Sequence, residues 1–499
     1  MQPKQGKAGL PVYYRWGLAA ASGLLITVLY PPFCLAMLGW FALTPLVLAL
    51  DGAPPLRGFL LGWLCGTISS LGVAGVWMFG AAHDYFQLTP LNAVLFTIGT
   101  TQIFVSVYFG CFGIAAALLS GRRLRFLLIP ALFVATEYAR AHLLTGSPWD
   151  LLGHSQRTLA LIQLCDLTGV YGLSFLLALV ATAVAELRRT LVPAVLAAVA
   201  VILALTYGQW RLLTSAITRG PNLQVLLVQA NLANQERGRP EFFSAHLNRY
   251  LDLTRQATPT PPALIVWPEN AIGFFPDGNP SLMARIMGYL RAQHTALLAG
   301  GPRAAGHGGV AAIHNSAYLF TADTTWTAYD KRVLLPFVER LPLRPADSPY
   351  VAGVEPTIFS VAGMRFGVLI CFEAIYPELA RDLVHHGAQL LVNISNDSWF
   401  EAGAGPEQHY EIARFRAVEN RISLVRVTNS GVTGVIDPTG REIARLPSRA
   451  PAAQLAKVPI VHAGSFYTRH GDFFAVACIA ASLISLVGVG LRSLGLLPQ

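Results

Sequence analysis

The feature that most constrains this chain is a series of long apolar segments, separated by short polar or proline-containing breaks. Seven of them precede the central region and an eighth lies near the C-terminus: 16–29, 34–50, 59–81, 91–119, 126–144, 167–187, 191–207 and 473–491. Only 13% of all residues are charged, against roughly 25% in soluble proteins. Because each segment approaches the ~20 residues that span a bilayer, the sequence predicts a polytopic membrane protein with about eight helical spans. A soluble enzyme, a disordered chain and a coiled coil are excluded.

Basic residues are unevenly distributed among the connecting loops. They precede the first segment and follow the second, fourth, sixth and eighth: Lys4, Lys7, Arg15, Arg57, Arg122, Arg123, Arg125, Arg188, Arg189 and Arg492. Since cytoplasmic loops carry an excess of Lys and Arg, we expect the N-terminus inside and residues 214–467 outside. The net charge of +9 fits this membrane orientation. A nucleic-acid partner is not expected, since no basic, aromatic motif is found.

The central region, residues 214–467, has the composition of a globular domain. Its apolar runs have the length of strands: 223–229, 263–267, 296–299, 316–320, 365–370, 390–394 and 424–427. Helical patterns cover 377–386 and 407–421. Alternating strands and helices predict an α/β sandwich. The expected organisation is a membrane block of about seven spans at 1–213, this domain at 214–467, and a C-terminal transmembrane helix at 468–499.

Cys371 is the one cysteine in the polar part of the chain. It closes an apolar strand, and a helix is expected to begin just after it. A thiol facing a helix N-terminus sees a positive partial charge that favours the nucleophilic thiolate. The alternative is a buried structural cysteine. The cysteines show no zinc-type spacing, so neither a metal nor a cofactor is expected.

Two further polar residues follow strand-like segments. Lys331 is one of few lysines in a chain that otherwise uses arginine, and its compact charge suits an oxyanion, although an ordinary surface lysine is the alternative. Glu269 lies between Trp267-Pro268 and Asn270, where partial burial would raise its pKa and suit a general base. Its alternative is a capping or solvated carboxylate. A base, a cation and a thiol at three strand ends together predict acyl transfer through a thioester.

Four motifs resemble the nitrilase superfamily: WPEN at 267–270, YDKRVLLPFVE at 329–339, LICFE at 369–373 and NISNDSWF at 393–400. A nitrilase-like domain between a seventh and an eighth apolar helix is similar to the apolipoprotein N-acyltransferase family of bacterial inner membranes. Further matches are GPEQHYEIARFRAVE at 405–419, RVTNSGVTGVIDPTG at 426–440 and FYTRHGD at 466–472. The resemblance implies an αββα sandwich inserted between the last two helices of a transmembrane bundle, with the catalytic domain in the periplasm.

The resemblance also implies a mechanism. Glu269 would act as general base, Cys371 as nucleophile toward a phospholipid ester, and Lys331 would stabilise the oxyanion together with the backbone N–H that follows Cys371. The acyl chain would then pass to a diacylglyceryl-cysteine at a lipoprotein N-terminus, with ping-pong kinetics. Glu339 and Glu373 match supporting glutamates of the family, with a structural salt bridge as the alternative for each. We expect the chain to act as a monomer.

The sequence departs from the family pattern at two places. Phe372 stands where a tyrosine often follows the nucleophile, so the ring is kept and the hydroxyl is lost. The loop at 235–239 lacks a tryptophan that the family often carries there. Two other functions stay open: a membrane-tethered amidase or carbamoylase with the same three residues, and a transporter with an accessory domain. Glu137 is the polar residue that a transporter would place inside a span.

Overall fold

The computed structural model describes residues 10–122, 124–144, 146–215, 220–236, 238–257, 261–305, 312–323, 326–340, 348–400, 403–461, 464–493 and 496. The chain divides into two compact units. One comprises Met1–Trp210, Ala402–Ala404 and Asp472–Gln499, and the other Arg211–Glu401 and Gly405–Gly471. The domain limits expected from the sequence, at 213 and 467, stay a prediction. Lys4, Lys7, Arg123 and Arg237 lie outside the described residues.

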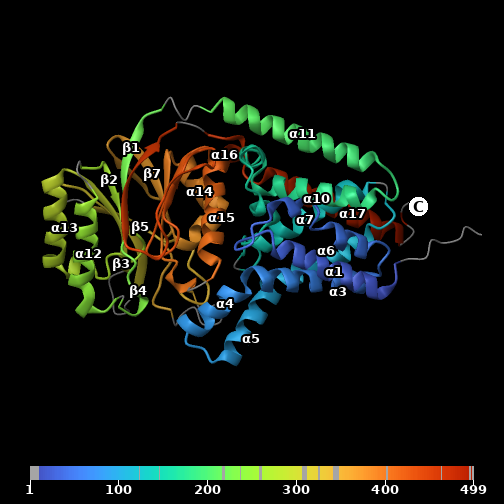
Figure 1. Ribbon diagram of the computed structural model, residues 1–499, viewed down its shortest axis with the longest axis horizontal. Helices are drawn as coiled ribbons and strands as arrows, with labels where there is room; N and C mark the ends of the chain where they lie inside the picture. Colours follow the sequence, from blue (N-terminus) through green and yellow to red (C-terminus); the bar gives the residue numbers. More distant parts are fainter. Residues whose placement is uncertain are drawn as a thin grey trace, which may run out of the picture. The chain divides into compact units, whose positions relative to one another are not determined.

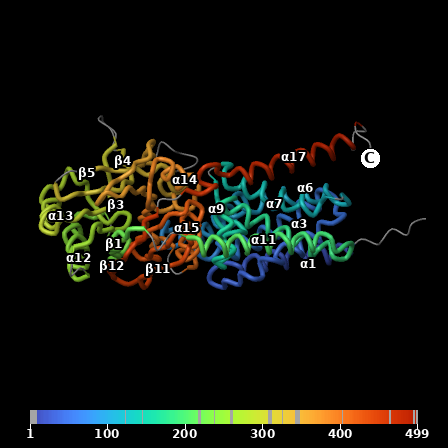
Figure 2. The backbone as a smooth tube through the Cα atoms, turned by 90° about the horizontal axis from the view of Figure 1, so that it is seen from above, coloured from blue at the N-terminus to red at the C-terminus, as the bar shows by residue number. Residues whose placement is uncertain are grey.

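The first unit is built from helices alone within its described residues (Figure 1). The α-helices are α1 (Val12–Thr27), α2 (Thr44–Leu50), α3 (Pro55–Ser70), α4 (Val76–Gly80), α5 (Pro90–Thr101), α6 (Val107–Leu118), α7 (Arg125–His142), α8 (Leu159–Ile162), α9 (Cys165–Thr168), α10 (Val170–Glu186), α11 (Val192–Leu213) and α17 (Phe473–Ser493). Several of the longer ones, among them α3, α6 and α7, run alongside one another (Figure 2).

Four helices of the described chain are long and apolar enough to cross a membrane: Pro55–Tyr85, Pro90–Leu118, Val192–Leu213 and Phe473–Arg492. The pair Leu159–Thr168 and Val170–Glu186, bent by 117°, is a fifth candidate. The predicted second span is not one helix, because it consists of a short turn at Ala36–Trp40 and of α2, whose first turn holds Pro45. The number of eight spans stays a prediction.

Small residues bring α3 and α6 into backbone contact. A Cβ atom at Gly62 of α3 would lie 2.1 Å from the Phe109 carbonyl oxygen, and one at Gly113 of α6 would lie 2.0 Å from that of Gly58. Helices in membranes associate through such small residues, because lipid offers no hydrophobic drive to bring them together. The apolar sequence of α3 thus folds into a specific helix pair.

The second unit contains two mixed six-stranded sheets. The first has the order β12-β1-β2-β3-β4-β5, and the second β11-β10-β9-β8-β7-β6. The strands are β1 (Asn222–Gln229), β2 (Leu264–Val266), β3 (Ala296–Ala305), β4 (Ala312–Phe320), β5 (Trp326–Asp330), β6 (Ile358–Val361), β7 (Met364–Ile370), β8 (Leu390–Ser395), β9 (Ser423–Thr428), β10 (Gly434–Ile436), β11 (Glu442–Arg445) and β12 (Ala452–Pro459). β1, β2 and β3 run parallel, as do β7, β8 and β9.

The two sheets share one apolar core and carry helices on their outer faces. Val225 and Val266 of the first sheet pack in the same buried cluster as Val368 and Val392 of the second. The outer helices are α12 (Phe243–Gln256) and α13 (Pro280–Gln293) on the first sheet, and α14 (Pro377–His385) and α15 (Gly405–Asn420) on the second (Figure 1); α16 (Phe466–His470) follows β12. The predicted αββα sandwich is confirmed, as are the seven predicted strands and two predicted helices.

Candidate active site

The predicted base, cation and thiol lie at strand ends of the two sheets. Glu269 follows β2, Lys331 comes directly after β5, and Cys371 directly after β7. Each is buried, with 4%, 1% and 3% of its surface exposed, respectively. The alternatives of a surface lysine and a solvated glutamate are therefore wrong.

The ammonium group of Lys331 lies between two carboxylates. Its Nζ is 2.7 Å from Oε2 of Glu339 and 3.5 Å from Oε1 of Glu269. Burial alone would lower the pKa of Lys331, but the charges of Glu339 and then Glu269 outweigh it, so that this pKa is raised. The lysine therefore stays a cation in a site that excludes water, where its charge acts with little screening.

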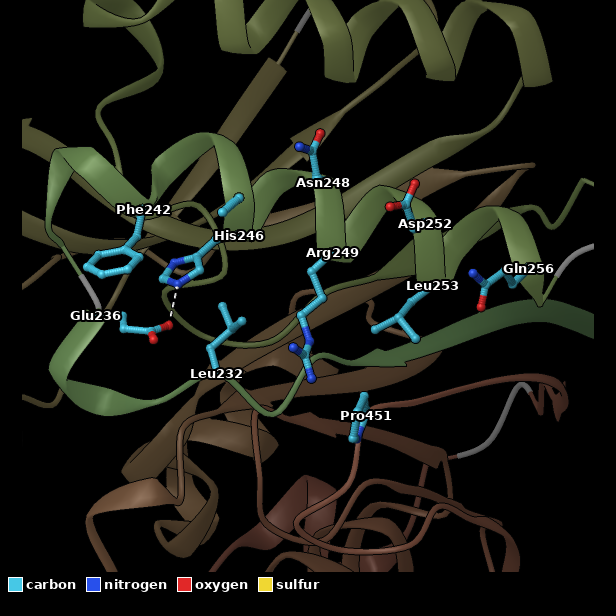
Figure 3. Close-up of a pocket in the computed structure, with 11 residues that line it drawn as sticks. Leu232, Glu236, Phe242, His246, Asn248, Arg249, Asp252, Leu253, Gln256 and Pro451 are labelled. Atoms are coloured by element: carbon cyan, nitrogen blue, oxygen red, sulfur yellow. Dashed lines mark hydrogen bonds and ion pairs between the residues drawn. The ribbon is translucent and has the colours of Figure 1, made fainter.

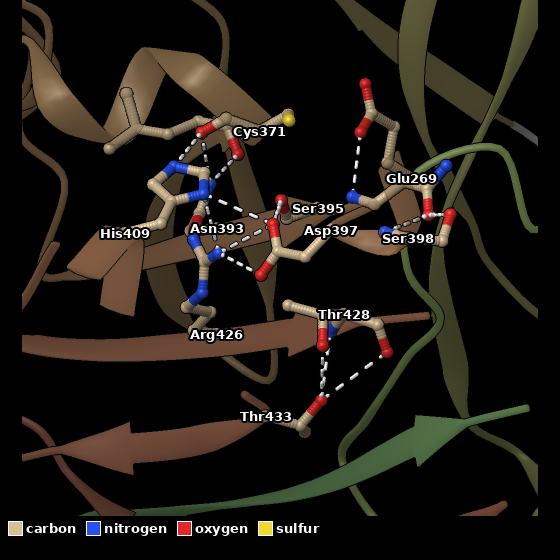
Figure 4. Close-up of polar contacts among 12 residues, drawn as sticks. Glu269, Cys371, Asn393, Ser395, Asp397, Ser398, His409, Arg426, Thr428 and Thr433 are labelled. Atoms are coloured by element: carbon tan, nitrogen blue, oxygen red, sulfur yellow. Dashed lines mark hydrogen bonds and ion pairs between the residues drawn. The ribbon is translucent and has the colours of Figure 1, made fainter. Parts of the chain in front are cut away.

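Neutral donors hold the two carboxylates in place. The side-chain amide of Asn315, on β4, donates to Oε1 of Glu269 at 2.8 Å and to Oε1 of Glu339 at 2.6 Å. The backbone N–H of Asn396 donates to Oε2 of Glu269 at 2.9 Å (Figure 4). The backbone of Lys331 is itself fixed, since its N–H donates to the Asn315 carbonyl at 2.8 Å. Both carboxylates and the ammonium group are thus oriented before any substrate arrives.

Cys371 opens a short 3-10 turn, Cys371–Ile375, and has a left-handed backbone with φ of 52°. Burial, and after it the charge of Glu269, raises the pKa of the thiol, while Lys331 opposes this rise. The expectation of a thiolate stabilised by a helix N-terminus is therefore wrong, because a turn of five residues provides little dipole and the desolvation dominates. The thiol in this environment therefore stays protonated unless a base accepts its proton.

Glu373 joins the segment of the lysine to that of the cysteine. Its Oε1 accepts the hydroxyl of Tyr329 at 2.9 Å and the backbone N–H of Arg332 at 2.6 Å. Its Oε2 accepts the N–H of Ile370, directly before Cys371, at 2.7 Å. Glu373 is fully buried. One side chain therefore links the backbone segments that carry two of the three predicted residues.

Known proteins resemble both parts of the chain. Residues 22–183 match the family model of the apolipoprotein N-acyltransferase N-terminal domain, and residues 225–465 match the carbon-nitrogen hydrolase model. A protein of Geobacter metallireducens named apolipoprotein N-acyltransferase is 36% identical over 94% of each chain. The chain belongs to the apolipoprotein N-acyltransferase family. Another member, from Azotobacter vinelandii, is 35% identical over 86% of each chain. As a member of this family, the chain is a membrane-bound acyltransferase.

Among solved structures, an amidase from Nesterenkonia sp. covers 48% of this chain and 92% of its own length. Its sequence identity to the chain is 21%, and the TM-score is 0.37.

Family membership overturns the transporter alternative, and the structure gives Glu137 another role. Glu137 lies in α7, and its Oε1 accepts the backbone N–H of Leu152 at 2.6 Å. The residue is buried, with 4% of its surface exposed. It therefore ties the segment around Leu152 to α7 in this acyltransferase.

The two departures from the family pattern lie in different surroundings. The ring of Phe372 is half-buried and packs edge-on against Tyr376, with centroids 5.4 Å apart. The tryptophan-free loop forms a turn at Asn234–Glu236, beside a cavity of about 710 Å³ that Arg249 and Pro451 also line (Figure 3). Glu269, Lys331 and Cys371 do not line this cavity.

The sequence reasoning missed several residues around the candidate site. Asn396 and His409 lie inside motifs that carry the family resemblance, so a signal for them was present. Asn315 lies on β4 outside any such motif, and only the fold brings it to Glu269 and Glu339. Polar residues that support a site from a neighbouring strand have no spacing that a sequence could reveal.

Proposed function

We propose that this chain N-acylates the diacylglyceryl-cysteine at the N-terminus of apolipoproteins, with a phospholipid as acyl donor. The observation that carries the proposal is the ammonium of Lys331, buried between Glu269 and Glu339. Cys371 lies near enough for the charges of Glu269 and Lys331 to act on its thiol. Family membership supports acyl transfer, and this arrangement supplies a nucleophile, a base and an oxyanion stabiliser for it.

In the first half-reaction, Glu269 accepts the proton of the Cys371 thiol. The sulfur attacks the ester carbonyl of the phospholipid, and the negative charge that develops on its oxygen is stabilised by Lys331 and by the backbone N–H of Phe372. The carbon–oxygen bond then breaks, and Glu269 returns its proton to the leaving oxygen. A lysophospholipid departs, and the acyl chain stays on Cys371 as a thioester.

In the second half-reaction, the free α-amine of the diacylglyceryl-cysteine attacks the thioester. Glu269 accepts a proton from this amine, the same two groups stabilise the oxyanion, and the carbon–sulfur bond breaks. The thiol is restored by the proton held on Glu269, and the product carries an amide-linked third acyl chain. Because the first product leaves before the acceptor reacts, the kinetics should be ping-pong.

Both substrates are held in a bilayer by their acyl chains, which agrees with a membrane-bound enzyme. We propose that the protein lies in the inner membrane with residues 214–467 in the periplasm. Arg15 of α1, Arg125 of α7, and Arg188 and Arg189 after α10 all contact the segment at Ala49–Asp51. Basic residues gathered at one end of the bundle support a cytoplasmic position for that end. We further propose that the enzyme acts as a monomer.

The test is to incubate the purified protein with phospholipid alone and to measure its intact mass. The wild-type chain should gain one fatty acyl group on Cys371, removable by hydroxylamine, and a diacylglyceryl lipopeptide should then discharge it. Cys371→Ala should gain none. Absence of the adduct on the wild type, together with hydrolysis of small amides, would instead support a membrane-tethered amidase.

A further inference from the structure

The carbonyl group of Cys371 is held by two side chains of the second sheet and its helices. Nε2 of His409, on α15, lies 3.2 Å from this oxygen, and Nδ2 of Asn393, on β8, donates to it at 3.4 Å (Figure 4). His409 is buried, with 1% of its surface exposed. Neither side chain belongs to the proposed base, cation and nucleophile.

The surroundings of His409 determine which of its nitrogens carries the proton. Its Nδ1 lies 3.0 Å from Nη2 of Arg426 and 3.2 Å from Oδ1 of Asp397. Because a guanidinium only donates, Nδ1 accepts from Arg426, and the proton of the neutral ring is on Nε2. Burial, and after it the charge of Arg426, lowers the pKa of His409 and keeps the ring neutral. Nε2–H therefore donates to the Cys371 carbonyl.

Hydrogen bonds also hold Arg426, which orients the ring of His409. Its Nη2 donates to Oδ2 of Asp397 at 2.8 Å, and its Nη1 donates to Oδ1 of Asn393. Burial would raise the pKa of Asp397, but the charge of Arg426 outweighs it, so that this pKa is lowered and Asp397 stays ionised beside the guanidinium. The group formed by Asn393, Asp397, His409 and Arg426 is thus connected and buried throughout.

A peptide unit is planar and trans, so its C=O and N–H point in opposite directions. The two donors on the Cys371 carbonyl therefore fix the direction of the Phe372 N–H. This matters because Cys371 has φ of 52°, a conformation that a residue other than glycine adopts only where its surroundings hold it. Without these donors the peptide could rotate and turn the N–H away from the oxyanion.

We propose that His409 is a positioning residue for the acyltransferase, which donates to the Cys371 carbonyl and thereby aims the Phe372 N–H at the oxyanion. Arg426 and Asp397 set the tautomer in which it can donate. The inference rests on the proposed function, because it assumes that an acyl group is transferred to Cys371.

Two substitutions separate the hydrogen bond from the volume of the ring. His409→Ala removes the donor and should lower the rate of Cys371 acylation by phospholipid roughly 100-fold, the usual loss for one oxyanion donor. His409→Gln keeps an N–H that reaches the carbonyl and should recover most of the rate. His386→Ala is the matched control. Nδ1 of His386 also lies near an aspartate, 3.3 Å from Oδ1 of Asp382, but His386 is exposed and directly follows α14. This variant should acylate at the wild-type rate.

Alkylation by iodoacetamide distinguishes this role from a merely structural one. Alkylation of a thiol passes through no oxyanion, whereas acylation does. His409→Ala should therefore alkylate Cys371 within threefold of the wild-type rate while its acylation is lost. Where the alanine variant does not fold, His409→Asn replaces it, because its shorter side chain can accept from Arg426 without reaching the Cys371 carbonyl.

Three results would overturn the inference: an unchanged acylation rate in the alanine or asparagine variant, an equal loss of acylation and alkylation, or a glutamine variant as slow as alanine. Failure of the proposed function looks different, because the wild-type chain would then form no thioester on Cys371 at all. The unfolding temperature of each variant, measured in detergent, confirms that the compared proteins are folded.

Discussion

At the scale of single residues, the site combines groups that would be unfavourable if buried alone. Lys331 is tolerated inside the domain because two carboxylates surround it, and Glu339 is the closer of the two at 2.7 Å. Whereas Lys331 keeps its charge, Cys371 stays a neutral thiol, because burial raises its pKa. In the proposed mechanism, Cys371 therefore starts as a neutral thiol and passes its proton to Glu269 within the reaction.

This balance predicts the pH dependence of Cys371 alkylation. A raised pKa means that the thiolate fraction is still increasing at a pH where an ordinary thiol, with a pKa of about 8.5, has levelled off. The rate of iodoacetamide alkylation, followed for the Cys371 peptide by mass spectrometry, should keep rising above about pH 10, where an ordinary thiol is almost fully ionised. N-acetylcysteine under the same conditions is the reference. A plateau below pH 8 would reveal a preformed thiolate and contradict a raised pKa of the Cys371 thiol.

At the scale of elements, the loop that carries Glu269 is positioned by its close approach to β3. The N–H of Gly300 donates to the Pro268 carbonyl at 3.1 Å, and the Gly300 carbonyl accepts the N–H of Ile272 at 2.9 Å. A Cβ atom on Gly300 would lie 2.6 Å from the Cα atom of Glu269. Only glycine permits this contact without moving the loop.

Gly300→Ala should therefore displace Glu269 and reduce Cys371 acylation by at least tenfold, a loss typical of a misplaced catalytic group. The overcrowding should also destabilise the domain by about 1–3 kcal/mol. Gly288→Ala on α13 is the matched control, because a Cβ atom there meets nothing within 4 Å. Acylation rates and unfolding temperatures of the two variants provide the measurement. An unchanged rate in Gly300→Ala would show that the loop can shift without affecting the base.

Sequence patterns predicted the central strands of the sandwich better than its edges. The five missed strands are β5, β6, β10, β11 and β12, and four of these lie at the ends of the two sheets. Edge strands are solvated on one side and carry fewer apolar residues, as the mostly exposed Glu442–Arg445 illustrates. The pairing of β12 with β1 joins distant parts of the chain. No local pattern can indicate such a pairing.

The same limit applies to the site. Glu269 and Cys371 were visible at strand ends in the sequence, because each follows an apolar run. Lys331 was placed near a strand end, but β5, the strand directly before it, was among those missed. The contacts of Asn315 with two carboxylates were not visible, since they depend on how β4 lies beside the loops. The protonation of Cys371 was predicted wrongly, because burial is a property of the whole domain.

At the scale of the whole molecule, the proposed orientation can be tested on intact cells. In a Cys111→Ala background, one cysteine is introduced at Asp277 in the second unit, or at Leu56 beside Arg57. Both sites are exposed. An impermeant maleimide should label Asp277→Cys in intact cells with a permeable outer membrane, and Leu56→Cys only after lysis, as the positive-inside rule requires. Labelling of Leu56→Cys first would reverse the orientation.

The placement of Lys331 between Glu269 and Glu339 has a consequence for the whole catalytic cycle. One cation and two anions give the resting group a net charge of minus one. When the proton passes from the sulfur to Glu269, the negative charge moves from the Glu269 carboxylate to the sulfur. No ion therefore has to enter or leave the interior. The proposed proton transfers therefore leave the total charge of the site unchanged. Since added salt screens mainly exposed charges, it should leave the rate of these transfers almost unchanged.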